Sequence, residues 1–356
     1  MRRPFFGVTA GAVVAGALVL AGCSSSSSSG ASGSASSSSS SSSGTTSSAP
    51  VTVRLGLLAN ITHAPALVAV KEGFFTKALG SAGTLQTTTF TSGTQETTAI
   101  LAGQLDAAYV GPNPAINAWQ KSSGTAIKIV SGVATGGASF VVKSSITSAA
   151  QLKGQGVATP SLGNTQDVAI RYWLKQQGLA TTTTGGGDVS VRPTSTNADA
   201  VLEFESGQIA GASEPAPYDV EMVNDGGKVL LSEPGSTTLL MVTQSFLSAH
   251  PTIVADLLKA NLQALALIKS NPTQAEADAD AEYASYTGKA IKSSLVAASF
   301  QQIDFTADPD ESSIATDASQ AVSLGLLKEP VSLSGMYDLT ELNSLLSAAG
   351  QQTVGS

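Results

Sequence analysis

One short motif occurs twice in the chain, each time at the end of a predicted helix and the start of a predicted strand. Its first copy is Leu101–Ala108 (LAGQLDAA) and its second copy is Glu205–Ala212 (ESGQIAGA). A proline follows soon after each copy, at Pro112 and at Pro215. Two helix-to-strand units that end alike restrict the fold strongly, because they predict two lobes of like topology.

Strand and helix patterns alternate through the first part of the globular region. Short apolar runs predict strands at residues 53–58, 85–90, 105–110, 127–130, 139–143 and 157–159. Helical patterns lie at residues 64–72 and 94–102 and from Asn164 or Thr165 to Gly178. Beyond Thr243 we expect helices from Pro251 to Asn271 and at residues 275–286, 290–300, 311–324 and 339–348. This order is typical of an α/β fold with mainly parallel sheets.

The residues just after each copy of the motif are candidates for a binding site, because ligands of open α/β sheets bind at the carboxyl ends of the strands. After the first copy these residues are Gly111, Pro112 and Asn113, and after the second they are Ser213, Glu214 and Pro215. A carboxylate at Glu214 could accept a hydrogen bond from a ligand N–H group and would repel an oxyanion. The alternative for Glu214 is a solvated loop charge.

Two predicted helices begin with small polar residues that suit an anionic or strongly polar ligand. One begins at Gly163, Asn164 and Thr165 and the other at Ser92 and Gly93. Free N–H groups and the positive end of the helix dipole favour such ligands at these positions. The alternative is two ordinary capped helices.

Three further polar residues belong to the same region of the predicted fold. His63 lies between the first predicted strand and the first predicted helix, where it either contacts the ligand or caps the helix. Asp167 and Arg171 are four residues apart on one helix, which predicts a surface ion pair.

The N-terminus has the pattern of a secreted lipoprotein. Residues 1–22 predict a signal peptide, with Arg2 and Arg3 followed by an apolar run that is too short to span a bilayer comfortably. The run ends in LAGC, so Cys23 is the expected lipidation site and the expected anchor on the extracytoplasmic face of the cell membrane. Residues 23–50 are rich in serine and predict a disordered tether.

Composition excludes several classes of function. Cys23 is the only cysteine, so disulfides, thiolate zinc sites and a cysteine nucleophile are excluded from the globular part. Without Arg2 and Arg3 the 18 basic residues become 16 against 26 acidic ones, a net charge of −10 that argues against nucleic acid binding. The two histidines have no metal-ligand spacing, and no catalytic or cofactor motif is present. We therefore expect no metal, no cofactor and no catalytic residues.

Several segments, in their order along the chain, resemble a known family. They are Ala69–Phe75, Ser92-Gly93 with Leu101–Asp106, Leu152–Gly154, Leu162–Asp167, Trp173-Leu174 with Gly178-Leu179, Gly207–Ile209, Glu214-Pro215 and His250-Pro251. The chain resembles the substrate-binding proteins of ABC importers for nitrate, taurine and aliphatic sulfonates, a family that includes thiamine-pyrimidine binders.

The resemblance implies an α/β, two-lobed, periplasmic-binding-protein-like fold of type II with the ligand in the crevice between the lobes. It places lobe I at residues 51–141 plus 243–356 and lobe II at residues 142–242, with crossovers near residues 141–144 and 239–242. It implies ligand contacts at the turns matching Ser92-Gly93, Gly111-Pro112, Gly163-Asn164-Thr165 and the Glu214 region. The implied partners of this monomer are a small polar or anionic ligand, an ABC permease and its ATPase.

Two other functions stay open from the sequence. The yeast thiamine-pyrimidine synthases share this fold, but their cysteine-rich motif is missing here, so we expect a binding protein and not an enzyme. A surface lipoprotein that senses or adheres is the other alternative. Sulfonate, taurine, nitrate and an uncharged thiamine-pyrimidine-like heterocycle all fit small polar turns.

Overall fold

The structure is a computed structural model, and it describes residues 49–355. The predicted signal peptide, Cys23 and nearly all of the predicted tether lie outside the described residues.

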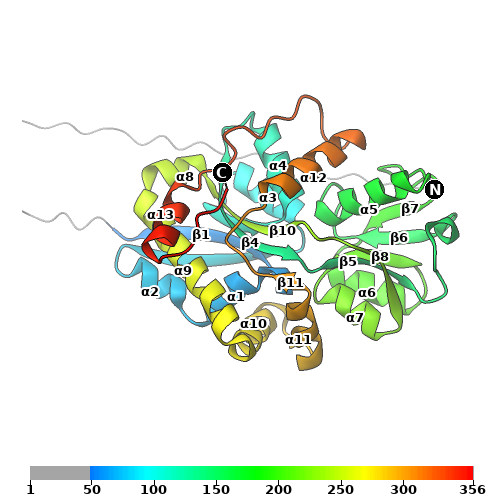
Figure 1. Cartoon of the computed structure of the whole chain (residues 1–356), viewed down its shortest axis with the longest axis horizontal. Helices are drawn as coiled ribbons and strands as arrows, with labels where there is room; N and C mark the ends of the chain where they lie inside the picture. Colours follow the sequence, from blue (N-terminus) through cyan, green and yellow to red (C-terminus); the bar gives the residue numbers. More distant parts are fainter. Residues whose placement is uncertain (1–48, 356) are drawn as a thin grey trace, which may run out of the picture. The chain divides into compact units, whose positions relative to one another are not determined.

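Two β-sheets organise the described chain (Figure 1). The six-stranded sheet has the order β11-β4-β10-β3-β1-β2, and the five-stranded sheet has the order β7-β6-β8-β5-β9. The strands of the first sheet are β1 (Val51–Leu58), β2 (Gly83–Phe90), β3 (Ala107–Val110), β4 (Ile127–Gly136), β10 (Ser236–Thr243) and β11 (Ile303–Asp304). Those of the second are β5 (Ala138–Lys143), β6 (Gly156–Thr159), β7 (Ser190–Pro193), β8 (Gly211–Pro215) and β9 (Gly227–Ser232).

The two sheets share one topology. In the first sheet β1 pairs in parallel with β2 and β3, and β10 enters antiparallel between β3 and β4. In the second sheet β6 pairs in parallel with β7 and β8, and β5 enters antiparallel between β8 and β9. In each sheet, the antiparallel strand is the one that directly follows a passage of the chain between the sheets.

The repeated motif lies at equivalent places in the two sheets, which confirms the prediction drawn from it. Its first copy leads from α3 (Gly93–Leu101) into β3, and its second leads from α6 (Asn197–Glu205) into β8. Both copies turn at a glycine in the left-handed region, with φ of 70° at Gly103 and 76° at Gly207. Only glycine adopts this conformation without steric cost, which is why the motif keeps it.

Helices cover both sheets. We call the first sheet with its helices lobe I (residues 49–136 and 236–355) and the second sheet with its helices lobe II (residues 138–232). Besides α3, the helices of lobe I are η1 (Ile61–His63), α1 (Ala64–Lys71), α2 (Phe74–Leu79), α4 (Pro112–Lys121), α8 (Gln244–Ala249), α9 (Pro251–Ser270), α10 (Pro272–Thr287), α11 (Ser293–Gln301), α12 (Glu311–Ser323) and α13 (Thr340–Ala348). Besides α6, lobe II has η2 (Ala149–Leu152), α5 (Thr165–Gln176) and α7 (Tyr218–Asn224).

The chain passes between the sheets at Gly137 and again at residues 233–235, earlier than the crossovers expected at residues 141–144 and 239–242. The physical reason is strand pairing. Val141 and Val142 of β5 pair with β8 inside the second sheet. Residues 239–242 of β10 pair with β3 inside the first sheet.

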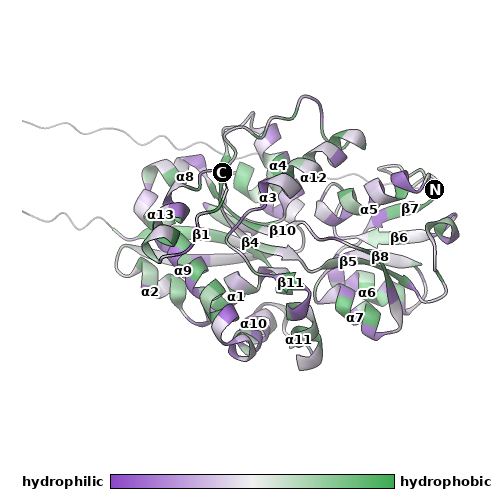
Figure 2. Ribbon diagram, viewed as in Figure 1, coloured by the Kyte–Doolittle hydropathy of each residue, from purple (hydrophilic) through white to green (hydrophobic). Residues whose placement is uncertain are grey.

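Apolar side chains fill both faces of each sheet, and Figure 2 shows the strands in a mixture of green and white. Among residues 49–355, one helix, α9, is long and apolar enough to cross a membrane. Its Val254, Leu257 and Leu258 are buried in the core of lobe I, so α9 is a core helix of this lobe.

Candidate functional site

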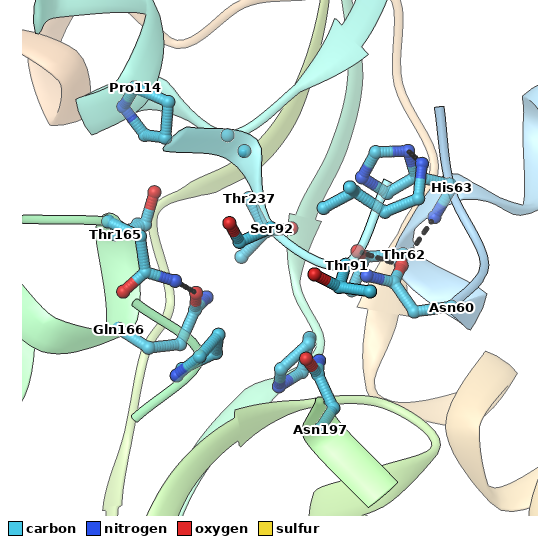
Figure 3. A pocket seen from close by; sticks show the side chains of 16 residues that line it. Asn60, Thr62, His63, Thr91, Ser92, Pro114, Thr165, Gln166, Asn197 and Thr237 are labelled. Atoms are coloured by element: carbon cyan, nitrogen blue, oxygen red, sulfur yellow. Dashed lines mark hydrogen bonds between the residues drawn. The ribbon is translucent and has the colours of Figure 1, made fainter. Parts of the chain in front are cut away.

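A small cavity lies between the two lobes at the ends of several strands (Figure 3). Lobe I lines it with Leu58, Asn60, Thr62, His63, Thr91, Ser92, Gly93, Gly111, Pro114 and Thr237. Lobe II lines it with Pro160, Asn164, Thr165, Gln166, Asn197 and Pro215. The cavity volume is about 30 Å³. A single water needs about 10–15 Å³ by the same measure, so the space suits a small group.

The structure brings together six of the ten predicted ligand-binding residues. His63, Ser92, Gly93, Gly111, Asn164 and Thr165 line the cavity. The other four, Pro112, Asn113, Gly163 and Glu214, do not line it.

Helix α5 presents its N-terminus to the cavity from lobe II. The side chain of Asn164 caps the helix, because its Oδ1 accepts a hydrogen bond from the Asp167 N–H at 2.9 Å. Within residues 49–355, no acceptor takes the N–H groups of Thr165 and Gln166. Thr165 is buried, with only 7% of the residue exposed. Its hydroxyl nevertheless has no hydrogen-bond partner in the described part of the chain. This hydroxyl is therefore free to bond to a group inside the cavity.

Helix α3 presents its N-terminus to the same cavity from lobe I. Ser92 caps it by accepting a hydrogen bond from the Gln95 N–H at 3.4 Å. The N–H groups of Gly93 and Thr94 have no acceptor among the residues described here. Helix α4 offers fewer donors, because Pro112 and Pro114 occupy its first turn and proline carries no N–H. The anion-binding capacity of the cavity therefore rests on α3 and α5.

The lobes touch each other beside the cavity. The hydroxyls of Thr94 in lobe I and Ser161 in lobe II lie 3.0 Å apart. A Cβ atom added to Gly111 would lie only 2.8 Å from the Thr165 hydroxyl across the interface. The described conformation is therefore a closed one.

His63 faces the cavity as a neutral imidazole (Figure 3). Its Nδ1 accepts a hydrogen bond from the Leu58 N–H at 3.2 Å, and burial lowers its pKa to about 3. The single ring proton must then lie on Nε2, which makes the ring a neutral donor at that atom. His63 does not cap α1 through its side chain, so the structure does not support the alternative role of a helix cap.

Glu214 lies beside the cavity but not in its wall. It is fully buried on β8, and neither carboxyl oxygen has a hydrogen-bond partner within the described chain. Burial first, and then the nearby Asp219 and Glu233, raise its pKa well above the usual range. Its buried environment thus favours the protonated form of Glu214, and the solvated loop charge considered for it is wrong.

Two further carboxylic acids are buried nearby. Asp219 lies in helix α7 of lobe II, and Glu233 lies in the segment that returns from lobe II to lobe I. Burial raises the pKa of Glu233 to about 7, although the Ser213 hydroxyl donates to its Oε1 at 2.6 Å. Burial also raises the pKa of Asp219 to about 7, against hydrogen bonds that include those from the Gln302 amide at 3.0 and 3.2 Å.

We expect the free energy of unfolding to fall as the pH rises from about 5 to about 8. The folded protein holds a proton on Glu233 up to a pKa of about 7, whereas the unfolded chain releases it near 4.5. The stabilisation by the Glu233 proton is fully present below the pKa of Glu233 in the unfolded chain, 4.5. It is lost as the pH rises through the pKa of Glu233 in the folded protein, about 7. The loss from Glu233 is on the order of 1–3 kcal/mol.

Thermal unfolding at several pH values measures this slope, and Glu233→Gln should reduce it because glutamine cannot ionise. The acidic groups that face Glu233 are Asp219, Asp317 and Glu214, and all three remain in the variant. A slope that is equal in wild type and Glu233→Gln would contradict the assignment.

The ion pair of Asp167 and Arg171 is buried, so the predicted surface pair is wrong. The exposed fractions of the two side chains are 0% and 2%, and Arg171 Nε donates to Asp167 Oδ1 at 2.9 Å. Arg171 also donates to the carbonyl oxygens of Thr182 and Val191, which connects α5 to β7 and the preceding loop. Sequence spacing could not show this, because only the packing of β7 beside β6 covers this face of the helix.

Gly163 shapes the turn before α5 and does not contact the cavity. Its φ is 75°, a left-handed conformation that favours glycine. Its N–H group donates to Asp167 Oδ2 at 2.9 Å, so it is not free for a ligand. The close backbone approach to a ligand therefore cannot depend on Gly163.

The cavity is built to hold a polar or anionic group by neutral donors. None of its lining residues carries a charge at neutral pH. Among the described residues, no cluster of three or more histidine, cysteine, aspartate or glutamate side chains could hold a metal ion. The available contacts are N–H groups, hydroxyls and the His63 ring, which together suit the oxygen atoms of an oxyanion.

The sequence reasoning missed several lining residues, among them Asn60, Thr91, Asn197 and Thr237. Asn197 follows Thr196, which forms a capping box with Asp199 at the start of α6, and that T-x-x-D pattern was a readable signal. Thr237 lies at the start of β10 on the return from lobe II, and no local sequence pattern marks it.

Comparison with known proteins places the chain in one family. A family model described as the NMT1-like family matches residues 47–282. No curated protein sequence matches the chain.

Solved structures share the fold at low sequence identity. The alkanesulfonate-binding protein SsuA of Xanthomonas axonopodis pv. citri, bound to MOPS, is 15% identical with a TM-score of 0.65, over 82% of this chain and 99% of SsuA. The periplasmic nitrate-binding protein NrtA of Synechocystis PCC 6803 is 16% identical with a TM-score of 0.65, over 84% of this chain and 89% of NrtA. The Candida albicans CA3427 gene product, described as having the generic periplasmic binding protein fold, is 13% identical with a TM-score of 0.63, over 81% and 96%.

These similarities confirm the predicted two-lobed α/β fold of periplasmic binding proteins. They carry no information on the ligand of this chain, since one fold hosts many functions.

Proposed function

This chain belongs to the NMT1-like family, and from that membership and the geometry of the cavity we propose that it is the solute-binding protein of an ABC importer. In this proposal the two lobes close on a small ligand and deliver it to a membrane permease that works with an ATPase. The protein acts as a monomer and as a binding protein, not an enzyme. The absence of any charged residue from the cavity lining supports binding over acid–base catalysis.

We propose that the ligand carries a small oxyanion group of the sulfonate, taurine or nitrate type. The observation that carries this proposal is the buried, unpartnered Thr165 hydroxyl beside the free N–H groups of Thr165 and Gln166. The N-terminus of α3 supplies matching donors from the opposite lobe. Two helix dipoles that point at one small cavity favour negative charge there without any basic side chain.

A thiamine-pyrimidine-like heterocycle is the second candidate, and one observation favours it. A cavity of about 290 Å³ adjoins the first one, with Leu58, Asn60, Thr91 and Asn197 in both linings. Its other lining residues include the aromatic side chains Phe90, Tyr218, Tyr283 and Tyr286. Aromatic walls would suit a planar ring.

Thermal unfolding of the purified protein with a panel of nitrate, taurine, alkanesulfonates and a thiamine pyrimidine distinguishes these ligands. A ligand at about one hundred times its Kd should add about 2.7 kcal/mol of stability. No shift with any oxyanion would overturn the proposed ligand class. A shift with the pyrimidine alone would establish the second candidate.

Thr165→Val should weaken oxyanion binding by about 0.5–1.5 kcal/mol, roughly a two- to tenfold change in Kd, because it removes one hydroxyl donor and keeps the shape of the side chain. Thr98→Val is the matched control, since the Thr98 hydroxyl is exposed and donates to the Thr94 carbonyl within α3. Isothermal titration with the best oxyanion of the panel measures both variants. Equal affinities in both variants would place the ligand away from α5.

We further propose that Cys23 is lipidated and that residues 23–50 tether the globular part to the extracytoplasmic face of the cell membrane. We expect Cys23→Ala to leave the protein unanchored or unprocessed, and Ser24→Ala to leave it in the membrane fraction. Cell fractionation and the intact mass of the mature protein measure this. Wild-type protein with an unmodified Cys23 in the soluble fraction would contradict the anchor.

A further inference from the structure

A second cavity lies on the other side of Thr165 and Thr237, and the proposed function does not use it. Its volume is about 360 Å³, many times that of the first cavity. Three segments form its walls: helix α5 of lobe II, the segment at residues 231–237 that returns from lobe II to lobe I, and helix α12 of lobe I. Figure 1 shows α12 beside α5, and Lys175 of α5 donates to the Ser323 carbonyl of α12 at 2.6 Å.

Buried polar atoms without partners face this cavity. Glu233 is only 8% exposed, and its Oε2 has no hydrogen-bond partner in residues 49–355. The hydroxyl of Ser236, a residue that is 2% exposed, likewise has none in that range. Native proteins rarely leave such atoms unsatisfied, so a bound group with hydrogen-bond donors is expected here.

The ionisable side chains at the two ends of the cavity are carboxylic acids. Glu233 and Asp317 are its ionisable carboxylic acids, and no lysine, arginine or histidine lines it. Burial, followed by the proximity of Glu233 and Asp310, raises the pKa of Asp317 to about 8. A cation bound between Glu233 and Asp317 would favour the ionised form of both carboxyl groups and offset the repulsion between them.

Aromatic side chains complete the lining. Tyr172 and Trp173 of α5 both line the cavity, and both are partly exposed. Aromatic faces beside carboxylates are the combination that recognises organic cations, because the ring quadrupole attracts the charge and the apolar wall covers the carbon atoms. A hydrated metal ion would gain nothing from such a wall.

We propose that this cavity is a second binding site, for a small organic ammonium ion. The ammonium group donates to Glu233 Oε2, to the Asp317 carboxylate and to the Ser236 hydroxyl, and its carbon atoms lie against Tyr172 and Trp173. The site is separate from the first cavity, although Thr165 and Thr237 line both. Because its walls come from both lobes, an occupied site stabilises the closed conformation.

Isothermal titration of the full protein with ethylamine, choline and 1,4-diaminobutane tests the proposal. The controls are 1,4-butanediol, which has no charge, and sodium chloride at matched ionic strength. We expect at least one of the amines to bind with one-to-one stoichiometry and neither control to bind. No binding by any of the three amines up to about 10 mM would overturn the proposal.

Matched variants locate the binding to this cavity. Glu233→Gln and Asp317→Asn keep the side-chain shapes and remove the charges, so each should weaken amine binding about tenfold or more. Glu341→Gln removes an exposed acidic charge on α13, away from the lining, and should leave the affinity unchanged. Thermal unfolding of each variant without amine shows that it is folded. Equal weakening in all three variants, or none in the first two, would refute the assigned site.

Discussion

Asp167→Ala is expected to lower the free energy of unfolding by about 3–5 kcal/mol, the usual cost of breaking a buried ion pair from one side. The carboxylate of Asp167 accepts three hydrogen bonds: from Arg171 Nε at 2.9 Å, from the Thr159 hydroxyl at 3.1 Å and from the Gly163 N–H at 2.9 Å. Its removal leaves the charged Arg171 buried without a counterion. It also removes the acceptor of the Gly163 N–H group, and with it a hydrogen bond that holds the turn before α5.

Asp256→Ala is the matched control for this prediction. Asp256 pairs with Lys259 within α9 at 2.9 Å, but the lysine side chain is 48% exposed. Exposed pairs contribute about 0–1 kcal/mol, so this variant should remain close to wild type. Urea unfolding followed by circular dichroism measures both losses. A loss below about 1 kcal/mol for Asp167→Ala would mean that water reaches the pair in solution.

Gly111→Val is expected to weaken ligand binding about tenfold to a hundredfold by preventing the lobes from closing. A Cβ at this position would lie 2.8 Å from the Thr165 hydroxyl of the opposite lobe, which is closer than real Cβ contacts. The backbone itself tolerates the change, since φ of Gly111 is −70°. Lobe I should therefore fold normally while its contact with lobe II is blocked.

Gly156→Val is the control, because a Cβ there would meet no atom within 4 Å. Isothermal titration with the best oxyanion of the panel gives the affinities of both variants. X-ray scattering at saturating ligand adds an independent readout, since Gly111→Val should keep the larger radius of gyration of an open molecule. An unchanged affinity together with an unchanged radius would show that closure does not bring Gly111 against Thr165.

Local sequence patterns were sufficient for most of α5 and its surroundings. Asn164 caps the helix as its position predicted, and the strand before the turn lies at β6. The sequence predicted Gly163 as a ligand contact, whereas in the structure it forms the left-handed turn before α5 and does not line the cavity. Whether a glycine permits ligand approach or only a left-handed turn depends on which way the turn faces, and that orientation is set by Asp167 and Arg171 below it.

The sequence by itself determined the α/β architecture, the two equivalent lobes and the helix N-termini that face the ligand cavity. These features depend on apolar periodicity, capping residues and a repeated motif, all of which act over a few neighbouring residues. Only the tertiary structure decided which charges are buried. Asp167 and Arg171 look like an ordinary surface pair in the sequence, and for Glu214 the sequence left a site residue and a loop charge open. The burial of all three comes from strands and loops distant in the chain. Burial is a property of the packed lobes, and it decides the charge and the hydrogen-bonding role of each of these side chains.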